Sequence, residues 1–103
     1  MDWKPLGELR DYSTVMPLPT NMKELQVVVG VGQYRMIYNV SRYALYATVA
    51  GDKLSACSAK VFADGSWHEI SAMLKFNAQS AWVHLVTLDE AATSDFIVWF
   101  YYK

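Results

Sequence analysis

The chain has 103 residues, of which 53% are hydrophobic and 15% aromatic, and its net charge at pH 7 is −1. This length fits one domain, residues 1–103, that buries its own core. The lone Cys57 excludes an intrachain disulfide and fits folding in a reducing cytosol. The charge lacks the basic stripe typical of nucleic-acid or anionic-membrane binding. We expect no membrane span, because no apolar run reaches 18 residues, and no signal peptide, because Asp2, Lys4 and Glu8 interrupt any apolar start.

The first 23 residues predict an irregular lead-in. Pro5, Gly7 and the two prolines at positions 17 and 19 prevent a long helix. Within this lead-in, residues 14–16 fit a short edge strand that ends at Pro17. Residues 18–21 form a turn signal.

Two strands are predicted next, over residues 23–31 and 34–40. In the first, Leu25, Val27 and Val29 share one face, and Gly30 and Gly32 predict a bulge or a bend near its end. Residues 41–50 carry a mixed signal, either extended or a single helical turn, and residues 51–52 fit a turn.

The second half predicts strands over residues 54–62, 67–77 and 81–88. The tetrapeptide 63–66 contains Asp-Gly, which supplies the positive φ of a tight hairpin. Residues 77–80 form the next turn, and residues 89–94 a polar loop.

A hairpin closed by residues 77–80 predicts the pairing of the two strands that flank it. Phe76 then lies opposite Ala81, and the register continues through the pairs Lys75/Trp82 and Met73/His84. This register places Val83 and Leu85 on the inner face with Ile70, Leu74 and Phe76. It places Trp82, His84, Val86 and Met73 on the outer face.

The last stretch, residues 95–103, is apolar on both faces of an extended chain. Phe96, Val98, Phe100 and Tyr102 point one way, and Ile97, Trp99 and Tyr101 point the other. Such a strand needs cover on both sides, so we expect it at the centre of a sheet. Together these short, alternating segments predict an all-β fold, an antiparallel β-sandwich of about six to eight strands.

The predicted outer face is too apolar for simple exposure to water. A subunit interface is the first interpretation; a ligand platform and ordinary exposed hydrophobic residues are the alternatives. We therefore predict a symmetric homotrimer. Its predicted interface residues are Trp82, His84, Ile97, Trp99 and Tyr101.

No catalytic, metal or cofactor site is predicted. His68 and His84 fall on opposite faces, without a third ligand at a suitable spacing, which leaves only His84 around a symmetry axis as a metal alternative. Asp89 and Glu90 read as a solvated turn. Ser55, Cys57 and Ser58 lie in a strand without a base and an orienting group.

Aromatic and basic residues interleave most densely between positions 34 and 46. Such a set binds single-stranded nucleic acid or sugars by stacking. The alternative is that the tyrosines are core residues with their hydroxyls at the rim, which we expect for Tyr38. Arg42 and Tyr43, in the following segment, are the residues here that we expect to bind ligand.

Three features together resemble the C-terminal tip domain of bacteriophage tail fibres and of tail-fibre-like bacterial adhesins. They are Trp3 near the start, the segment Leu-Pro-Thr-Asn-Met-Lys-Glu-Leu at 18–25, and the ending Phe-Tyr-Tyr-Lys at 100–103. The family has a Leu-Pro-x-Asn-x-x-Glu-hydrophobic start and an aromatic-Tyr-Tyr-Arg ending. Lys103 stands in place of the usual Arg, and the mid-domain Gly-Tyr pair is missing.

The resemblance implies a non-catalytic trimeric head on a fibrous shaft that would precede residue 1. It implies binding to a receptor on a host or prey cell, often a glycan, from a virion or an extracellular adhesin folded in the cytoplasm. The candidate ligand contacts are loop residues with aromatic or polar groups: Arg42, Tyr43, Asp64, Trp67, Asn77 and Gln79. The alternatives are a free-standing lectin-like module or a small structural virion protein, with an enzyme third.

Overall fold

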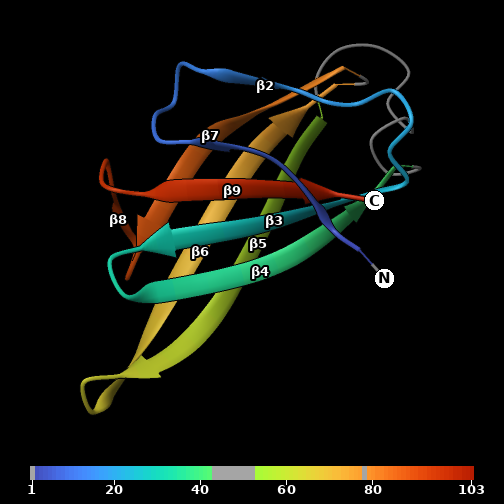
Figure 1. The fold of residues 1–103 in the computed structure, drawn as a ribbon. Helices are drawn as coiled ribbons and strands as arrows, with labels where there is room; N and C mark the ends of the chain where they lie inside the picture. The colour runs from blue at the N-terminus through green and yellow to red at the C-terminus, as the bar shows by residue number, and fades with distance from the viewer. Residues whose placement is uncertain (1, 43–52, 78) are drawn as a thin grey trace.

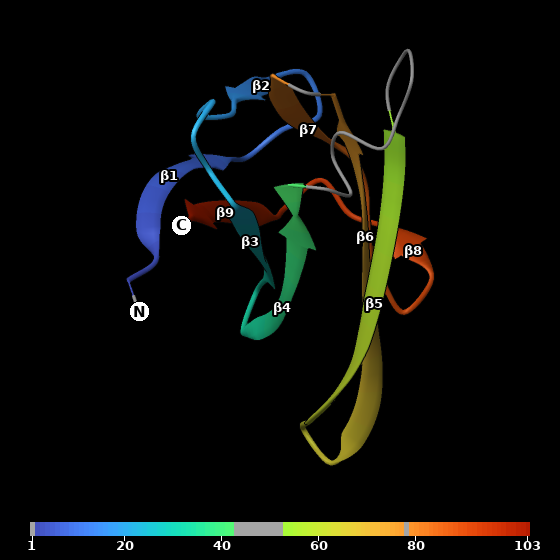
Figure 2. The same cartoon turned by 90° about the vertical axis from the view of Figure 1, so that its right-hand side faces the viewer.

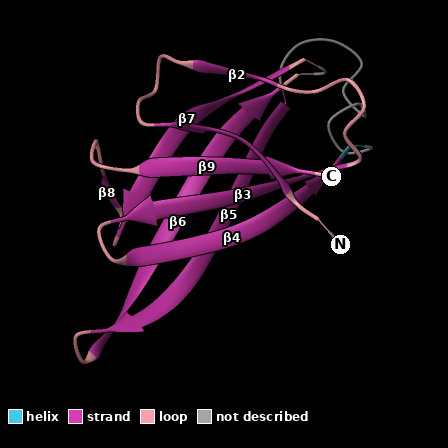
Figure 3. Ribbon diagram, in the orientation of Figure 1, coloured by secondary structure: helices cyan, strands magenta, loops and turns pink. Residues whose placement is uncertain are grey.

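The computed structural model describes residues 2–42, 53–77 and 79–103, and β-strands dominate these ranges (Figure 3). The expected turn or extended segment at 43–50 and the turn at 51–52 lie outside the described residues. The strands are β1 (Lys4–Leu9), β2 (Val15–Pro17), β3 (Glu24–Val31), β4 (Tyr34–Ser41), β5 (Lys53–Ala63), β6 (Ser66–Phe76), β7 (Ser80–Leu88), β8 (Ala91–Ala92) and β9 (Ile97–Tyr102).

The strands form two antiparallel sheets that face each other, which confirms the predicted β-sandwich (Figures 1 and 2). One sheet has the order β1-β9-β3-β4. The other has the order β2-β7-β6-β5, with β8 pairing to β7. Alternate residues of the strands, among them Leu25, Val27 and Val29 of β3, are buried between the sheets.

The terminal strand β9 lies inside its sheet, as its sequence predicts. It pairs with β1 on one side and with β3 on the other. Val98 and Phe100 are buried in the core, together with Phe96, which precedes the strand. Ile97, Trp99 and Tyr101 lie on the outer face, where each is partly exposed.

The prediction of an irregular lead-in is wrong for Lys4–Leu9, which form the edge strand β1. An edge strand tolerates Pro5 because one of its sides needs no ladder hydrogen bond. The register with β9 shifts between Pro5 and Gly7. A Cβ on Gly7 would lie 2.8 Å from the Met16 methyl carbon, so this bulge brings the backbone close to β2. The short edge strand that ends at Pro17 is confirmed.

The predicted register of β6 and β7 is correct at Phe76/Ala81 and Lys75/Trp82 but wrong at Met73, which pairs with Leu85. A bulge between Met73 and Leu74 leaves His84 as the extra residue on β7. Leu85 therefore turns to the outer face, and Val86 becomes fully buried in the core. The sequence prediction had these two residues on the opposite faces.

Tight turns close the hairpins at one end of the sandwich. Asp64 and Gly65 both have positive φ (52° and 79°), which confirms the Asp-Gly hairpin. Gly32 (φ 58°) makes the β3–β4 turn, whereas Gly30 stays in an unbroken ladder, so Gly30 forms no bulge. In the predicted polar loop, Asp89 and Glu90 form a turn of positive φ before β8.

We predict that Phe100→Ala lowers the free energy of unfolding by about 3–5 kcal/mol, because it removes a fully buried ring from the central strand. Phe62→Ala is the matched control. Its ring is exposed, so the loss should be within about 0.5 kcal/mol. Urea unfolding measures both; equal losses would contradict the assignment of the core.

Candidate binding site at the β5–β6 hairpin tip

Strands β5 and β6 have 11 residues each and extend beyond the other strands, so their hairpin projects from the body of the sandwich (Figure 1). We call residues 62–67 the hairpin tip. Phe62 and Trp67 pair across it, with ring centroids 5.2 Å apart in an edge-to-face arrangement. Their exposed fractions are 61% and 67%. Large aromatic rings that remain this exposed are suited to contact a partner or the C–H face of a sugar.

A polar cluster beside the tip ties three turns together. The Gln33 side chain, in the β3–β4 turn, donates to the Asp64 carboxylate at 2.9 Å. His68 Nδ1 is 2.7 Å from Asp89 Oδ2 in the β7–β8 turn. The other carboxylate oxygen of Asp89 accepts the Glu69 N–H at 3.0 Å. These contacts anchor the projecting hairpin to both sheets.

The His68–Asp89 contact, which we call the latch, shifts both groups toward their charged forms. The hydrogen bond to Asp89 raises the pKa of His68, against an opposing contribution from burial, and a bond to the Ala63 backbone adds to the increase. The same hydrogen bond from His68, with that from the Glu69 N–H, lowers the pKa of Asp89. Because a carboxylate only accepts, Nδ1 of His68 carries the hydrogen in this pair.

Ser66 extends this chain of contacts. Its Oγ is 3.1 Å from His68 Nε2, so a hydroxyl, an imidazole and a carboxylate follow one another as in a nucleophile–base–acid triad. The Asp89 side chain, however, is 49% exposed. These contacts hold the hairpin in place whether or not the three groups are catalytic.

Sequence reasoning missed this cluster, because it considered Ser55, Cys57 and Ser58 instead. The predicted β6–β7 register would place Asp89 opposite His68, but that register is wrong beyond the bulge. In the structure Asp89 lies opposite Glu69, and its side chain reaches the neighbouring His68. Tyr34, whose ring centroid is 5.1 Å from that of His68, comes from the other sheet and was not predictable from this register.

Among the described residues, the predicted ligand residues come together in two separate pairs: Asp64 and Trp67 at the hairpin tip, and Asn77 and Gln79 in the β6–β7 turn. Arg42 lies at the end of β4 and donates through Nη1 to the Met22 carbonyl at 2.7 Å. The Asn77 side chain accepts the backbone N–H groups of Gln79 and Ser80, as an ordinary turn residue does. Gln79 is exposed in that turn. Tyr43 lies outside the described residues.

The predicted interface residues fall on opposite sides of the sandwich. Trp82 and His84 are on the outer face of the β2-β7-β6-β5 sheet. Ile97, Trp99 and Tyr101 are on the outer face of the β1-β9-β3-β4 sheet. One flat contact cannot cover both sets.

Comparison with family models, curated proteins and solved structures finds no match to the chain. Among the described residues there is no group of three or more His, Cys, Asp or Glu side chains that could hold a metal ion. The same part of the chain has no helix long and apolar enough to cross a membrane.

The latch predicts a pH-dependent stability. The contribution of His68, whose pKa is raised, is complete below its ordinary value of 6.5 and is lost as pH rises through the raised pKa. The contribution of Asp89, whose pKa is lowered, is present above 3.8 and is lost as pH falls through the lowered value. The loss of Tm in His68→Gln should therefore be largest between about pH 4 and 6.5 and smaller at pH 9.

The interaction between His68 and Asp89 is measured by thermal unfolding across this pH range. The proteins compared are the wild type, His68→Gln, Asp89→Asn and the double variant. At pH 5 the loss of Tm in the double variant should be no larger than the loss in either single variant. A loss in His68→Gln that does not change with pH would contradict the latch.

Proposed function

We propose that the chain is a non-catalytic receptor-binding head, of the kind found at the tips of trimeric phage tail fibres and fibre-like adhesins. Its ligand would be a cell-surface glycan, and its place would be on a virion or outside the cell. The observation that carries the proposal is the exposed Phe62–Trp67 pair at the end of a projecting, anchored hairpin. The sequence resemblance at residues 18–25 and 100–103 supports it.

The proposed contact surface combines the two parts of a sugar site. Trp67 and Phe62 offer apolar faces for the C–H side of a sugar ring, and Asp64 beside them offers an acceptor for hydroxyl groups. Gln33 holds the Asp64 carboxylate from the neighbouring turn, so part of the site is already ordered before a ligand binds.

The proposed assembly is a homotrimer that contacts through the outer face of the β2-β7-β6-β5 sheet. Paired side chains form a row across this face: Val15, Trp82, Lys75 and Leu54. Val15 and Leu54 are 51% and 47% exposed. Exposed apolar side chains that lie together on one face are typical of an interaction surface.

The next row on this face contains Leu85, Met73 and Ala56, beside a hollow of about 260 Å³. A neighbouring chain would fill this hollow with apolar side chains. Phe62 and Trp67 alternate onto the same face further along the hairpin. A trimer built on it would present three aromatic tips together, and three weak sites would bind a crowded surface with useful avidity.

A free-standing lectin-like module or a small structural virion protein is the alternative, for which the chain would be a monomer or part of a larger assembly. An enzyme is a separate class. The observation that favours it is the Ser66–His68–Asp89 chain of contacts.

We predict that Trp67→Ala weakens binding of the assembled protein to receptor-bearing cells or to an arrayed glycan by about thirtyfold or more, because it removes an aromatic anchor. Ile37→Ala is the matched control. It removes a comparably exposed apolar side chain from the other sheet and should leave binding unchanged.

Equal binding by wild type and Trp67→Ala would contradict the site. Cleavage of a bound glycan or of an ester on it, abolished by Ser66→Ala, would contradict the non-catalytic proposal and make Ser66 a nucleophile.

A further inference from the structure

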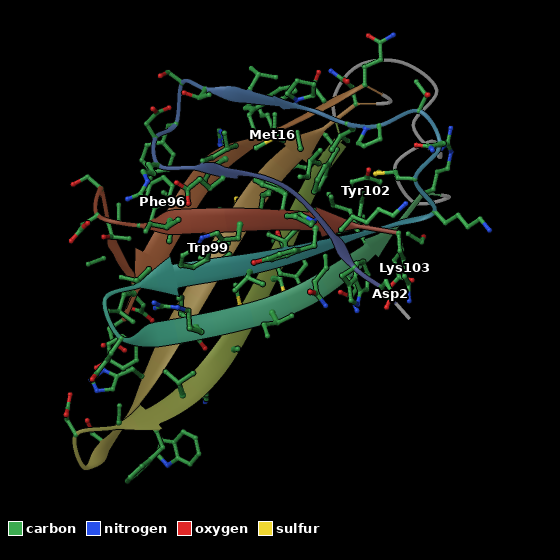
Figure 4. All side chains as sticks on the ribbon, in the orientation of Figure 1. Asp2, Met16, Phe96, Trp99, Tyr102 and Lys103 are labelled. Carbon is green, nitrogen blue, oxygen red and sulfur yellow. The ribbon has the colours of Figure 1, made fainter. Side chains whose placement is uncertain are left out.

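A second hollow lies on the outer face of the β1-β9-β3-β4 sheet, away from the hairpin tip. Its floor is Gly30 of β3, which pairs with Arg35 of β4 on one side and with Ile97 of β9 on the other. A Cβ on Gly30 would lie 2.7 Å from Trp99 Cζ3 and 3.2 Å from Arg35 Cζ. The indole and the guanidinium therefore converge over this glycine, and any other residue would push them apart. Figure 4 labels Trp99 at this position on β9.

The Arg35 guanidinium is held in place by the chain itself. Its Nη1 donates to the Gly32 carbonyl at 2.7 Å and to the Tyr34 carbonyl at 2.8 Å. Its Cζ lies 5.2 Å from the centroid of the Trp99 ring, within the range of a cation–π contact.

Arg35 nevertheless forms no ion pair with a carboxylate in the described part of the chain. The Nε and Nη2 N–H groups also have no acceptor there. These two groups form the edge of a guanidinium that binds a carboxylate with two parallel hydrogen bonds.

Asp95, an exposed acidic residue, is one of the residues that line the same hollow. Its backbone N–H donates to Thr93 Oγ1 at 3.2 Å, which fixes the turn that leads into β9. The hollow has a volume of about 190 Å³ and is lined by Gly30, Gly32, Arg35, Asp95, Phe96, Ile97 and Trp99. This volume is below the several hundred Å³ of pockets for drug-sized ligands, so it suits a single ring.

We propose that this hollow binds an acidic sugar, that is, one sugar ring that bears a carboxylate. The carboxylate would pair with the Nε–Nη2 edge of Arg35, and ring hydroxyls would donate to Asp95. The partly exposed Trp99 indole would face the C–H groups. Asp95 disfavours a simple carboxylate that brings no hydroxyl donors, and a neutral sugar leaves the Arg35 edge unpaired. The two charged groups together therefore select a ligand that has both chemistries.

An acidic sugar would be the ligand class of the proposed receptor-binding function. The proposal rests on that function only in taking the sugar to come from a cell surface. The geometry of the site is independent of the Phe62–Trp67 pair and of the β2-β7-β6-β5 face. It also requires that the Trp99 face stay open in the assembled protein.

The test compares methyl β-D-glucuronide with methyl β-D-glucoside, which differ only by a carboxylate in place of a hydroxymethyl group. Nuclear magnetic resonance titration of the ¹⁵N-labelled protein at pH 7 follows the Arg35 Nε–H and Trp99 indole N–H signals. We expect saturable shifts with glucuronide at a Kd around 1 mM, and at least about tenfold weaker binding of glucoside and of acetate.

Arg35→Gln should weaken glucuronide binding by about tenfold or more, because it removes the charge and the two-pronged edge. The affinity of Arg35→Lys for glucuronide should lie between those of the wild type and Arg35→Gln, because lysine keeps only the charge. Lys60→Gln is the control, since Lys60 is an exposed cationic residue on β5, in the other sheet. All three should retain the wild-type spectrum away from the substitution.

Equal affinities for glucuronide and glucoside or acetate would overturn the proposal. So would unchanged affinity in Arg35→Gln, or the absence of shifts up to about 50 mM glucuronide. Any of these results with Trp67-dependent cell binding intact leaves the proposed function standing. Glucuronide binding without any cell binding would instead contradict the proposed function and keep this site.

Discussion

Val98 and Phe100 of β9 are buried between the two sheets, while the backbone of the strand pairs with β1 on one side and β3 on the other. The last residue continues this pairing, because the Lys103 carbonyl accepts the backbone N–H groups of Lys23 and Glu24. The four-stranded sheet therefore cannot close until the end of the chain is in place. Folding depends on contacts between distant parts of the sequence, which is typical of slow-folding β-sandwiches.

The outer face of β9 is closed in a different way. Trp99 packs over Gly30, and the Arg35 guanidinium lies against its ring, so part of the cover that this face needs comes from the same chain. On the opposite sheet, Val15 and Leu54 are 51% and 47% exposed, and no such cover over them is seen in the described part of the chain. We therefore assign assembly to the β2-β7-β6-β5 face. We assign ligand contacts to the hairpin tip and to the Gly30 hollow.

Local signals in the sequence were sufficient for most of the fold. Alternation of apolar residues, the Asp64–Gly65 turn and the two-sided apolar character of β9 predicted most strands correctly, and their faces except at Leu85 and Val86. β1 was missed because Pro5 and Gly7 usually interrupt strands, and only its edge position and its approach to Met16 explain them. The bulge at His84 was missed because an extra residue leaves no mark in the alternation until the strands are paired.

The candidate sites were less predictable for the same reason. Trp67 and Asp64 are neighbours along the chain and were found. The latch joins His68 to Asp89, and the hollow joins Arg35 to Trp99 and Asp95; both depend on which strands lie side by side. The residues that carry the family resemblance have structural positions: Leu18 and Met22 are buried, and Lys23 pairs with Lys103. They therefore indicate a fold more directly than a ligand.

Sedimentation equilibrium tests most directly the claim that subunits cover the outer face of the β2-β7-β6-β5 sheet and leave the outer face around Trp99 free. The same substitution is made on each face, Trp82→Glu and Trp99→Glu, with circular dichroism to check that both variants fold. The account predicts a wild-type mass of about 35 kDa, three times the 11.7 kDa of the chain, which is kept in Trp99→Glu. Trp82→Glu should sediment as a monomer, because an unpaired charge in a dry interface is costly. A monomeric wild type, or a trimer that survives Trp82→Glu and dissociates in Trp99→Glu, would contradict the account.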